Sequence, residues 1–266
     1  MKTIILAPFG GLSQEAGIMY LLANYMLLFN SDTLQLTCNG IFSLCDRDRA
    51  NSWRRNISSC LQCMSDQRNL AAWGGLHEDA LSTYLRPEEV EKTKRWILTL
   101  AASELLTADY DGFALYELWQ GSFHRRFGEQ KPNLQNKHHE NFIRRLMLST
   151  LRMLHASKRF IDEQLPAVSF VAGGEDFITR SYIQQAKIKS SNIVKFSWDP
   201  GSRYVKILRA HDQSVFPCEV LLDSITSMRA DVKTWPEELV AILDEILDFL
   251  GMSESQLQLP MAQGSI

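Results

Sequence analysis

Apolar residues occur along the chain in two patterns, short continuous runs and helical spacing, and these patterns predict alternating strands and helices. Short apolar runs typical of buried strands are expected at residues 4–7, 33–38, 112–119 and 167–172, with further strands at 192–198 and 204–209. Stretches with apolar residues at helical spacing predict helices from Ser13 to residue 29 and at residues 59–72, 90–106, 137–162, 179–187 and 236–250. Strands and helices therefore alternate along most of the sequence.

The order of these elements indicates the fold class. The first fifty residues run strand, glycine turn, helix, strand, which is a βαβ unit. Apolar strands separated by helical stretches of about a dozen residues or more favour a parallel sheet with helices on both faces. We expect an α/β fold, a Rossmann-like mostly parallel sheet flanked by helices. One such domain is expected over residues 1–251, followed at 252–266 by a polar tail or the start of an interdomain linker.

Composition and charge narrow the class of protein. The 266 residues are 45% hydrophobic and 22% charged, and a formal net charge of -3 gives no sign of the basic stripe that nucleic-acid binders carry, so no nucleic acid is expected as a partner. The first ten residues are too short a run for a signal-peptide core, and no run reaches the roughly 18 apolar residues of a membrane span. We expect a cytoplasmic protein without a transmembrane segment. Peripheral association with the inner face of a membrane is compatible with this location.

The cysteines are expected either to remain reduced and unbound or to hold a metal ion. Five cysteines without an export signal indicate reduced thiols rather than a disulfide framework. Cys38, Cys45, Cys60 and Cys63 can together supply a tetrahedral zinc site, because the last two form a C-x2-C pair. The first pair is more widely spaced than usual, so buried reduced thiols are the default. We expect no cofactor for catalysis, with structural zinc as the alternative for these four residues.

The turn after the first strand is one candidate binding site. Gly10 and Gly11 allow the backbone to approach a ligand closely, and the helix that begins near Ser13 offers free N–H groups to an anion. The turn lacks the G-x-G-x-x-G pattern, so dinucleotide binding is poorly supported. A tight turn without a ligand is the alternative.

The segment GSFHRRF is a second candidate, placed at the end of the strand predicted at residues 112–119. Strand ends face the ligand crevice in this fold. His124 is suited to acid–base chemistry near neutral pH, and Arg125 and Arg126 can hold an oxyanion or a phosphate. A solvated basic loop is the alternative.

The third candidate follows the strand predicted at residues 167–172. Gly173 and Gly174 again permit close approach, Glu175 and Asp176 can bind sugar hydroxyls or act as a base, and Arg180 lies one turn into the next helix. Acidic residues at a helix start are also ordinary capping residues, which is the alternative here.

Taken over nearly its full length, the chain resembles the N-terminal domain of GT-B-type glycosyltransferases, which build bacterial capsular, envelope or lipopolysaccharide chains. The resemblance rests on the glycine turn after the first strand, on CNGIFSLCDRDRANSWRRNISSCLQC, on GSFHRRF, and on a closing part from IVKFSWDPGSRY to MRADVKTW. In such enzymes two Rossmann-like domains face each other. The N-terminal one holds the acceptor, and the C-terminal one holds the nucleotide-sugar donor.

The resemblance implies an acceptor-binding domain that serves sugar transfer in bacterial exopolysaccharide or envelope polysaccharide synthesis. The implied partners are a sugar or lipid-linked sugar acceptor and a second, nucleotide-sugar-binding domain, for which no room is left after Gly251. A metal-independent inverting transfer needs a base near the acceptor hydroxyl and positive groups near the departing diphosphate. The base candidates are His124 and Glu175. The candidate substrate-binding residues are Gly10, Gly11, Ser13, Arg125, Arg126, Gly173, Gly174 and Arg180.

Two other function classes compete with this hypothesis. A non-catalytic α/β binding or regulatory module fits the same pattern of elements, although the acidic pair and strand-three Asp of a response regulator are not present. A hydrolase would be expected to carry a nucleophile elbow, and the sequence holds no G-x-S-x-G. The binding module is therefore the main alternative.

Overall fold

The computed structural model describes residues 2–7, 14–29, 31–46, 57–128, 131–198, 202–217, 221 and 235–252. The predicted binding turn with Gly10, Gly11 and Ser13 lies outside the described residues, as does the tail after Met252. Residues 47–56, which precede the second helix, lie outside them as well.

A seven-stranded sheet forms the centre of the molecule, in the order β3-β2-β1-β6-β7-β8-β9. Its strands are β1 (Lys2–Ala7), β2 (Asp32–Thr37), β3 (His77–Ala80), β6 (Val168–Ala172), β7 (Asn192–Trp198), β8 (Tyr204–Arg209) and β9 (Asp212–Pro217). The five strands from β3 to β7 run parallel, and β8 and β9 add an antiparallel extension. The predicted fold class, a mostly parallel Rossmann-like sheet flanked by helices, is confirmed.

The strand order places a switch point in the middle of this sheet. From β1 the chain first moves outward through β2 to β3, and it later returns to pair β6 with the other side of β1. In sheets of this kind, ligands bind outside the carboxyl ends of the strands at the switch point, which here are β1 and β6. Residues that follow these strands are therefore the first place to look for a site.

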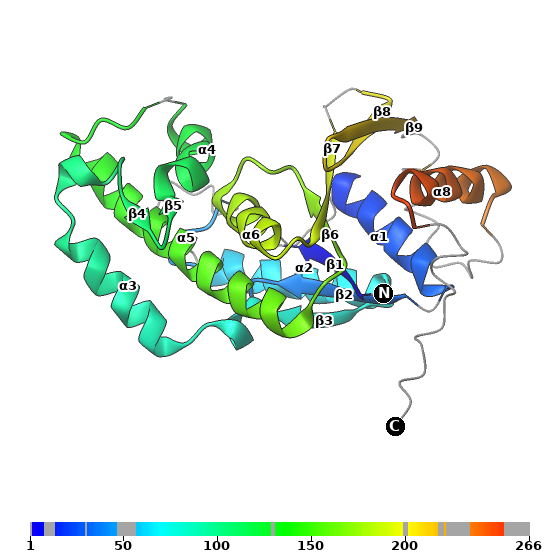
Figure 1. The fold of residues 1–266 in the computed structure, drawn as a ribbon, viewed down its shortest axis with the longest axis horizontal. Coiled ribbons are helices and arrows are strands. Elements are labelled where there is room, and N and C mark those ends of the chain that lie inside the picture. The colour runs from blue at the N-terminus through cyan, green and yellow to red at the C-terminus, as the bar shows by residue number, and fades with distance from the viewer. Residues whose placement is uncertain are drawn as a thin grey trace.

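Both faces of the sheet are buried under helices, as Figure 1 shows. On β1, Ile4 and Leu6 join one core while Ile5 joins the other, because successive strand residues point to opposite faces. One core is closed by α1 (Gln14–Leu27), α2 (Ile57–Trp73) and α8 (Glu237–Phe249). The other is closed by α5 (Lys137–Gln164) and α6 (Phe177–Ile188), with α4 (Leu115–Phe127) beside them.

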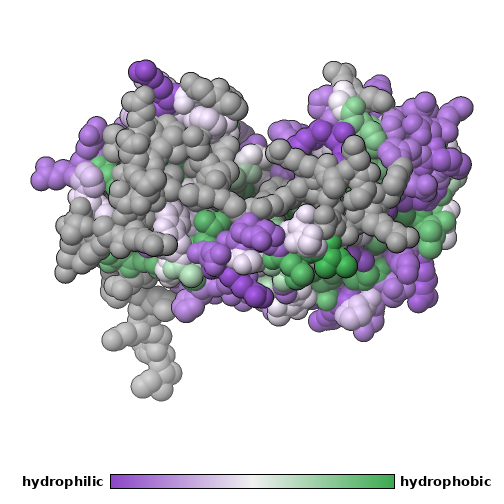
Figure 2. All heavy atoms as spheres, turned by 180° about the vertical axis from the view of Figure 1, so that it is seen from behind, coloured by the Kyte–Doolittle hydropathy of each residue, from purple (hydrophilic) through white to green (hydrophobic). Residues whose placement is uncertain are grey.

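A helical lobe separates β3 from β6 in the sequence and projects beyond the sheet, on the left in Figure 1. It consists of η1 (Leu81–Tyr84), α3 (Pro87–Thr99), η2 (Ala102–Glu104), β4 (Asp109–Tyr110), β5 (Phe113–Ala114), α4 and the first part of α5. Arg144 of α5 ties the end of α3 to the lobe by donating to the carbonyls of Ile97 at 2.7 Å and Leu100 at 2.9 Å. From behind, this lobe lies on the right, and its surface is mostly hydrophilic (Figure 2).

The strand predicted at residues 112–119 was wrong. Only Phe113 and Ala114 of this stretch are extended, and from Leu115 the chain is the helix α4. The buried residues of α4 recur at helical spacing: Leu115, Leu118, Trp119, Ser122 and Phe123. A short apolar run does not by itself distinguish a strand from a buried helix, and here one-sided burial in the lobe selected the helix.

The other predicted elements agree with the structure apart from their ends. The strands predicted at 4–7, 33–38, 167–172, 192–198 and 204–209 are present, whereas β3 and β9 were not predicted. The helix predicted to reach residue 106 ends at Thr99, before η2. Within the described parts of the chain, no helix is long and apolar enough to cross a membrane.

Candidate functional site

The turn after β6 needs its two glycines for geometric reasons. Gly173 and Gly174 have φ values of 70° and 134°, which side chains disfavour. A Cβ atom on Gly174 would lie 2.6 Å from the Cε atom of Lys195, so the side chain of this β7 residue passes directly over the turn. The N–H of Gly173 donates to the carbonyl of Phe196 at 2.9 Å and fixes the turn against β7. Close approach, predicted for a ligand, is realised here by a lysine side chain.

Glu175 and Arg180 are brought together, and the arginine also reaches α4. One Nη atom of Arg180 pairs with the carboxylate of Glu175, and the other donates to the carbonyl of Glu117 at 2.7 Å. The Glu175 side chain is 67% exposed. Its carboxylate is thus held at the surface by a charged partner.

Helix α4 packs so closely against the turn after β6 that no side chain fits between them at Gly121. A Cβ atom on Gly121 would lie 1.9 Å from the backbone oxygen of Glu175, so only glycine permits this contact. The next residue, Ser122, is buried and joins three segments. Its Oγ accepts the N–H of Phe177 at 2.9 Å and donates to Oδ2 of Asp46 at 2.6 Å.

Asp46, which follows β2, is a buried acid at the carboxyl edge of the sheet. Its side chain is 6% exposed. The pKa of Asp46 is raised to about 6, first by burial and then by the nearby charge of Asp176, and the hydrogen bond from Ser122 and the charge of Arg125 only partly oppose these two effects. The guanidinium of Arg125 lies 3.5 Å from Oδ2. A carboxyl with such a pKa exchanges protons near neutral pH.

Asp176 caps helix α6. It accepts hydrogen bonds from the N–H and the hydroxyl of Thr179, both at 2.9 Å. The capping alternative is therefore confirmed for this residue. Because its carboxylate is fixed by the cap and buried, its charge remains close to Asp46 and disfavours a second charge there.

The residues predicted at a strand end lie instead on the last turns of α4. His124 and Arg125 are exposed, and Arg126 is half-buried. Of the three, Arg125 forms an ion pair with the buried carboxylate of Asp46. His124 lies on the side of the helix opposite its buried face, so the reason for choosing it, a strand end facing the crevice, was wrong.

A groove of about 600 Å³ begins at the glycine turn and follows α6 toward β7 and β8. Its lining includes the predicted residues Gly174 and Arg180. It also includes the basic side chains Lys187, Lys195 and His211, against the single acidic residue Glu117. This excess of positive charge over a shallow, partly apolar surface favours an anionic ligand.

The carboxyl end of β1 is held by a chain of buried amides. The side-chain amide of Gln67 donates to the carbonyl of Ala7 at 2.6 Å, and the backbone carbonyl of Gln67 accepts from the side-chain amide of Gln35 at 2.8 Å. Gln35 in turn accepts the hydroxyl of Tyr20. These bonds tie α1 and α2 to the sheet and fix the strand end beside the switch point.

The four cysteines considered for zinc do not assemble a site among the described residues. Cys38 and Cys63 are buried, Cys45 and Cys60 are half-buried, and none of the four forms a disulfide within the described chain. No group of three or more His, Cys, Asp or Glu residues in the described parts of the chain is arranged to hold a metal ion. Burial raises the pKa of Cys38 to about 11, so this thiol is not poised to become a thiolate ligand.

Sequence reasoning missed Asp46, Ser122 and Lys195. Asp46 lies eight residues beyond the second predicted strand, so only its place in the segment that follows a strand pointed toward the carboxyl edge of the sheet. Ser122 and Lys195 gave no comparable signal, because their partners lie 76 and 21 positions away in the chain.

Comparisons of the chain with protein-family models, with curated proteins and with solved structures found no match.

Proposed function

We propose that the chain is the acceptor-binding half of a GT-B-type glycosyltransferase, which transfers a sugar from a nucleotide-sugar donor during bacterial exopolysaccharide or envelope polysaccharide synthesis. The observation that carries the proposal is Asp46, a buried carboxyl with a raised pKa at the carboxyl edge of a Rossmann-like sheet. Ligands in this fold bind outside that edge. The basic groove that starts at the neighbouring turn supports an anionic, sugar or lipid-linked sugar acceptor.

Asp46 is the proposed base. In an inverting transfer the acceptor oxygen bonds to the anomeric carbon while the bond from that carbon to the nucleotide diphosphate breaks, and the hydroxyl proton passes to the base. A carboxylate with a pKa near 6 is ionised at neutral pH and is a stronger base than an ordinary one. Asp46 replaces His124 and Glu175 in this role, because His124 lies on the exposed side of α4 and Glu175 is paired with Arg180.

The groove supplies the proposed acceptor contacts. Arg180 is held in place by Glu175 and the Glu117 carbonyl, so its position is fixed before a ligand arrives. Lys195 lies over the glycine turn, and Lys187 extends the positive charge along α6. A phosphate or sugar carboxylate of the acceptor would bind here by charge-assisted hydrogen bonds. The donor would be bound by a second domain.

The test is Asp46→Asn in the full gene product, assayed for transfer from a panel of nucleotide sugars. Removing a general base should lower kcat by about a hundredfold or more. The rate profile of the unmodified protein should lose activity below about pH 6, and this limb should vanish in Asp46→Asn. Asp32→Asn, at the exposed opposite end of β2, is the matched control and should keep full activity.

A non-catalytic binding module is the second candidate, favoured by the basic groove alone. It predicts no transfer with any nucleotide sugar, while an anionic oligosaccharide still binds and Lys195→Met weakens that binding. Transfer that is equally fast with Asp46→Asn and with the unmodified protein would contradict the assignment of the base.

A further inference from the structure

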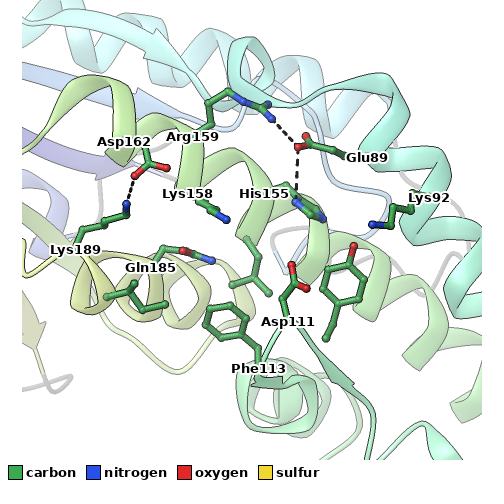
Figure 3. A pocket seen from close by; sticks show the side chains of 13 residues that line it. Glu89, Lys92, Asp111, Phe113, His155, Lys158, Arg159, Asp162, Gln185 and Lys189 are labelled. Carbon is green, nitrogen blue, oxygen red and sulfur yellow. Dashed lines mark hydrogen bonds and ion pairs between the residues drawn. The ribbon is translucent and has the colours of Figure 1, made fainter.

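A second cavity, of about 900 Å³, lies on the other side of α6 from the groove. Its walls come from α3, from the β4–β5 hairpin, from α5 and from the last turns of α6 (Figure 3). The two hollows share no lining residue. Gln185 and Lys189 of α6 line this cavity, whereas Arg180 and Lys187 line the groove. A volume of this size suits a small organic ligand.

The hairpin wall is rigid because of its turn. Asp111 and Gly112 have φ values of 53° and 82°, the conformation of a two-residue Asp-Gly hairpin turn. The N–H of Gly112 is held by Asp109 at 2.9 Å. Tyr110 packs edge-on against Trp96, with ring centroids 5.0 Å apart, and thereby joins the hairpin to α3.

Two ion pairs account for much of the charge in the wall. Arg159 pairs with Glu89 at 2.6 Å, and Lys189 pairs with Asp162 at 2.5 Å. Burial alone would raise the pKa of Glu89, but hydrogen bonds from Arg159 and from the backbone of Arg86 lower it. These pairs are satisfied within the protein and hold the wall together, so they are not the groups that would bind a ligand.

Three polar groups of the wall stay unused by the rest of the described chain. Lys92 and Lys158 make no ion pair there, and the amide of Gln185 makes no hydrogen bond, although this residue is only 5% exposed. Figure 3 shows Lys158 and Gln185 extending into the cavity from one side and Lys92 from the other, with the carboxylate of Asp111 between them. The Gln185 amide can therefore exchange solvent for the hydroxyl groups of a ligand in the cavity.

His155 adds a neutral polar group to this wall. Its Nδ1 lies 4.0 Å from the Glu89 carboxylate, yet burial lowers the pKa of the imidazole more than Glu89 and Asp111 raise it. Its Nε2 atom is buried and has no hydrogen-bond partner in the described chain. The free positive charge of the cavity therefore comes from the two lysines and not from the histidine.

We propose that this cavity binds a sugar phosphate. The phosphate would lie between the ammonium groups of Lys92 and Lys158, which are compact charges suited to phosphate. The sugar hydroxyls would bond to the Gln185 amide and the Asp111 carboxylate, and the C–H face of the ring would lie on Phe113. The site uses none of the residues assigned to sugar transfer and does not depend on that proposal.

Titration calorimetry with glucose 6-phosphate tests the site on the unmodified chain. Lys92→Met and Lys158→Met should each weaken binding about tenfold or more, because each removes a charge-assisted hydrogen bond to the phosphate. Gln185→Leu should weaken it as well, by removing the amide that bonds to the sugar hydroxyls. Lys94→Met removes an exposed lysine of the same helix, paired with Glu91, and should leave the affinity unchanged.

Glucose, inorganic phosphate and glucuronate complete the experiment. Glucose and inorganic phosphate should each bind more weakly than the ester, because each makes only part of the contacts. Tighter binding of glucuronate would overturn the assignment of a phosphate. Failure of several hexose phosphates to bind, or equal affinity in Lys92→Met, Lys158→Met and Lys94→Met with unchanged melting temperatures, would overturn the site itself.

Discussion

Substituting Gly121 with alanine tests the close contact between α4 and the turn after β6, on which the hydrogen bond from Ser122 to Asp46 depends. Helix propensity alone predicts that alanine stabilises the middle of α4 by about 1 kcal/mol. The structure predicts the opposite sign. The added Cβ would lie 1.9 Å from the backbone oxygen of Glu175 and 3.0 Å from its carbonyl carbon, and neither atom belongs to a flexible side chain.

The magnitude follows from the displacement. To relieve the overlap, α4 and the β6–α6 turn must separate by about 1 Å, which is the kind of overpacking that costs roughly 1–3 kcal/mol. The two bonds of Ser122, at 2.9 Å to Phe177 and 2.6 Å to Asp46, would then stretch beyond hydrogen-bonding range. Each is worth about 1 kcal/mol. After subtracting the helical gain, we expect a net destabilisation of about 2–4 kcal/mol.

Urea denaturation followed by circular dichroism measures this change. In a thermal melt followed by the same signal, the melting temperature should fall by roughly 4–16 °C, given about 2–4 °C per kcal/mol for a chain of this size class. His124→Ala, at an exposed position of the same helix, should change the free energy of unfolding by less than about 0.5 kcal/mol. Equal or greater stability of Gly121→Ala would mean that α4 does not approach the turn this closely and would refute the described geometry.

Two further predictions concern stability. Because the pKa of Asp46 is raised to about 6 in the folded state, the folded form loses stability relative to the unfolded one as pH rises from about 4 to 6. Asp46→Asn should therefore be more stable than the unmodified chain at pH 8, by up to about 3 kcal/mol, and lose this advantage at pH 4, as measured by urea denaturation at both values. Arg144→Met removes the hydrogen bonds to the carbonyls of Ile97 and Leu100 and should lower the free energy of unfolding by about 2–4 kcal/mol in the same assay. Arg95→Met, at an exposed position of α3, is the control, and an equally large loss of stability in both variants would contradict the anchoring role of Arg144.

Much of the sheet could be predicted from local pattern. The strands β1, β2, β6, β7 and β8 are apolar runs bounded by turn residues, and that signal survives without knowledge of the partner strand. β3, with the sequence HEDA, gave no such signal because it is a short, charged edge strand that is extended only through pairing with β2. α4 was misassigned because its run of apolar residues is compatible with either a strand or a one-sided buried helix.

The candidate site was predicted only in part. The glycine turn with Glu175 and Arg180 follows a recognisable strand, so its place at the carboxyl edge could be inferred from the sequence. The pairing of these two residues, the cap formed by Asp176 and the lysine over Gly174 required the coordinates. The cavity of the helical lobe was not anticipated at all, since its wall combines four elements spread over about a hundred positions.

The sequence by itself determined the alternation of strands and helices and, through it, the α/β class, because burial on two faces imposes a local period on the residues of each element. Only the tertiary structure decided which polar groups meet. The pKa of Asp46 depends on Ser122, Arg125 and Asp176, which belong to other parts of the chain, and on burial beneath α4. Such properties arise from distances across the fold, and no pattern of neighbouring residues encodes those distances.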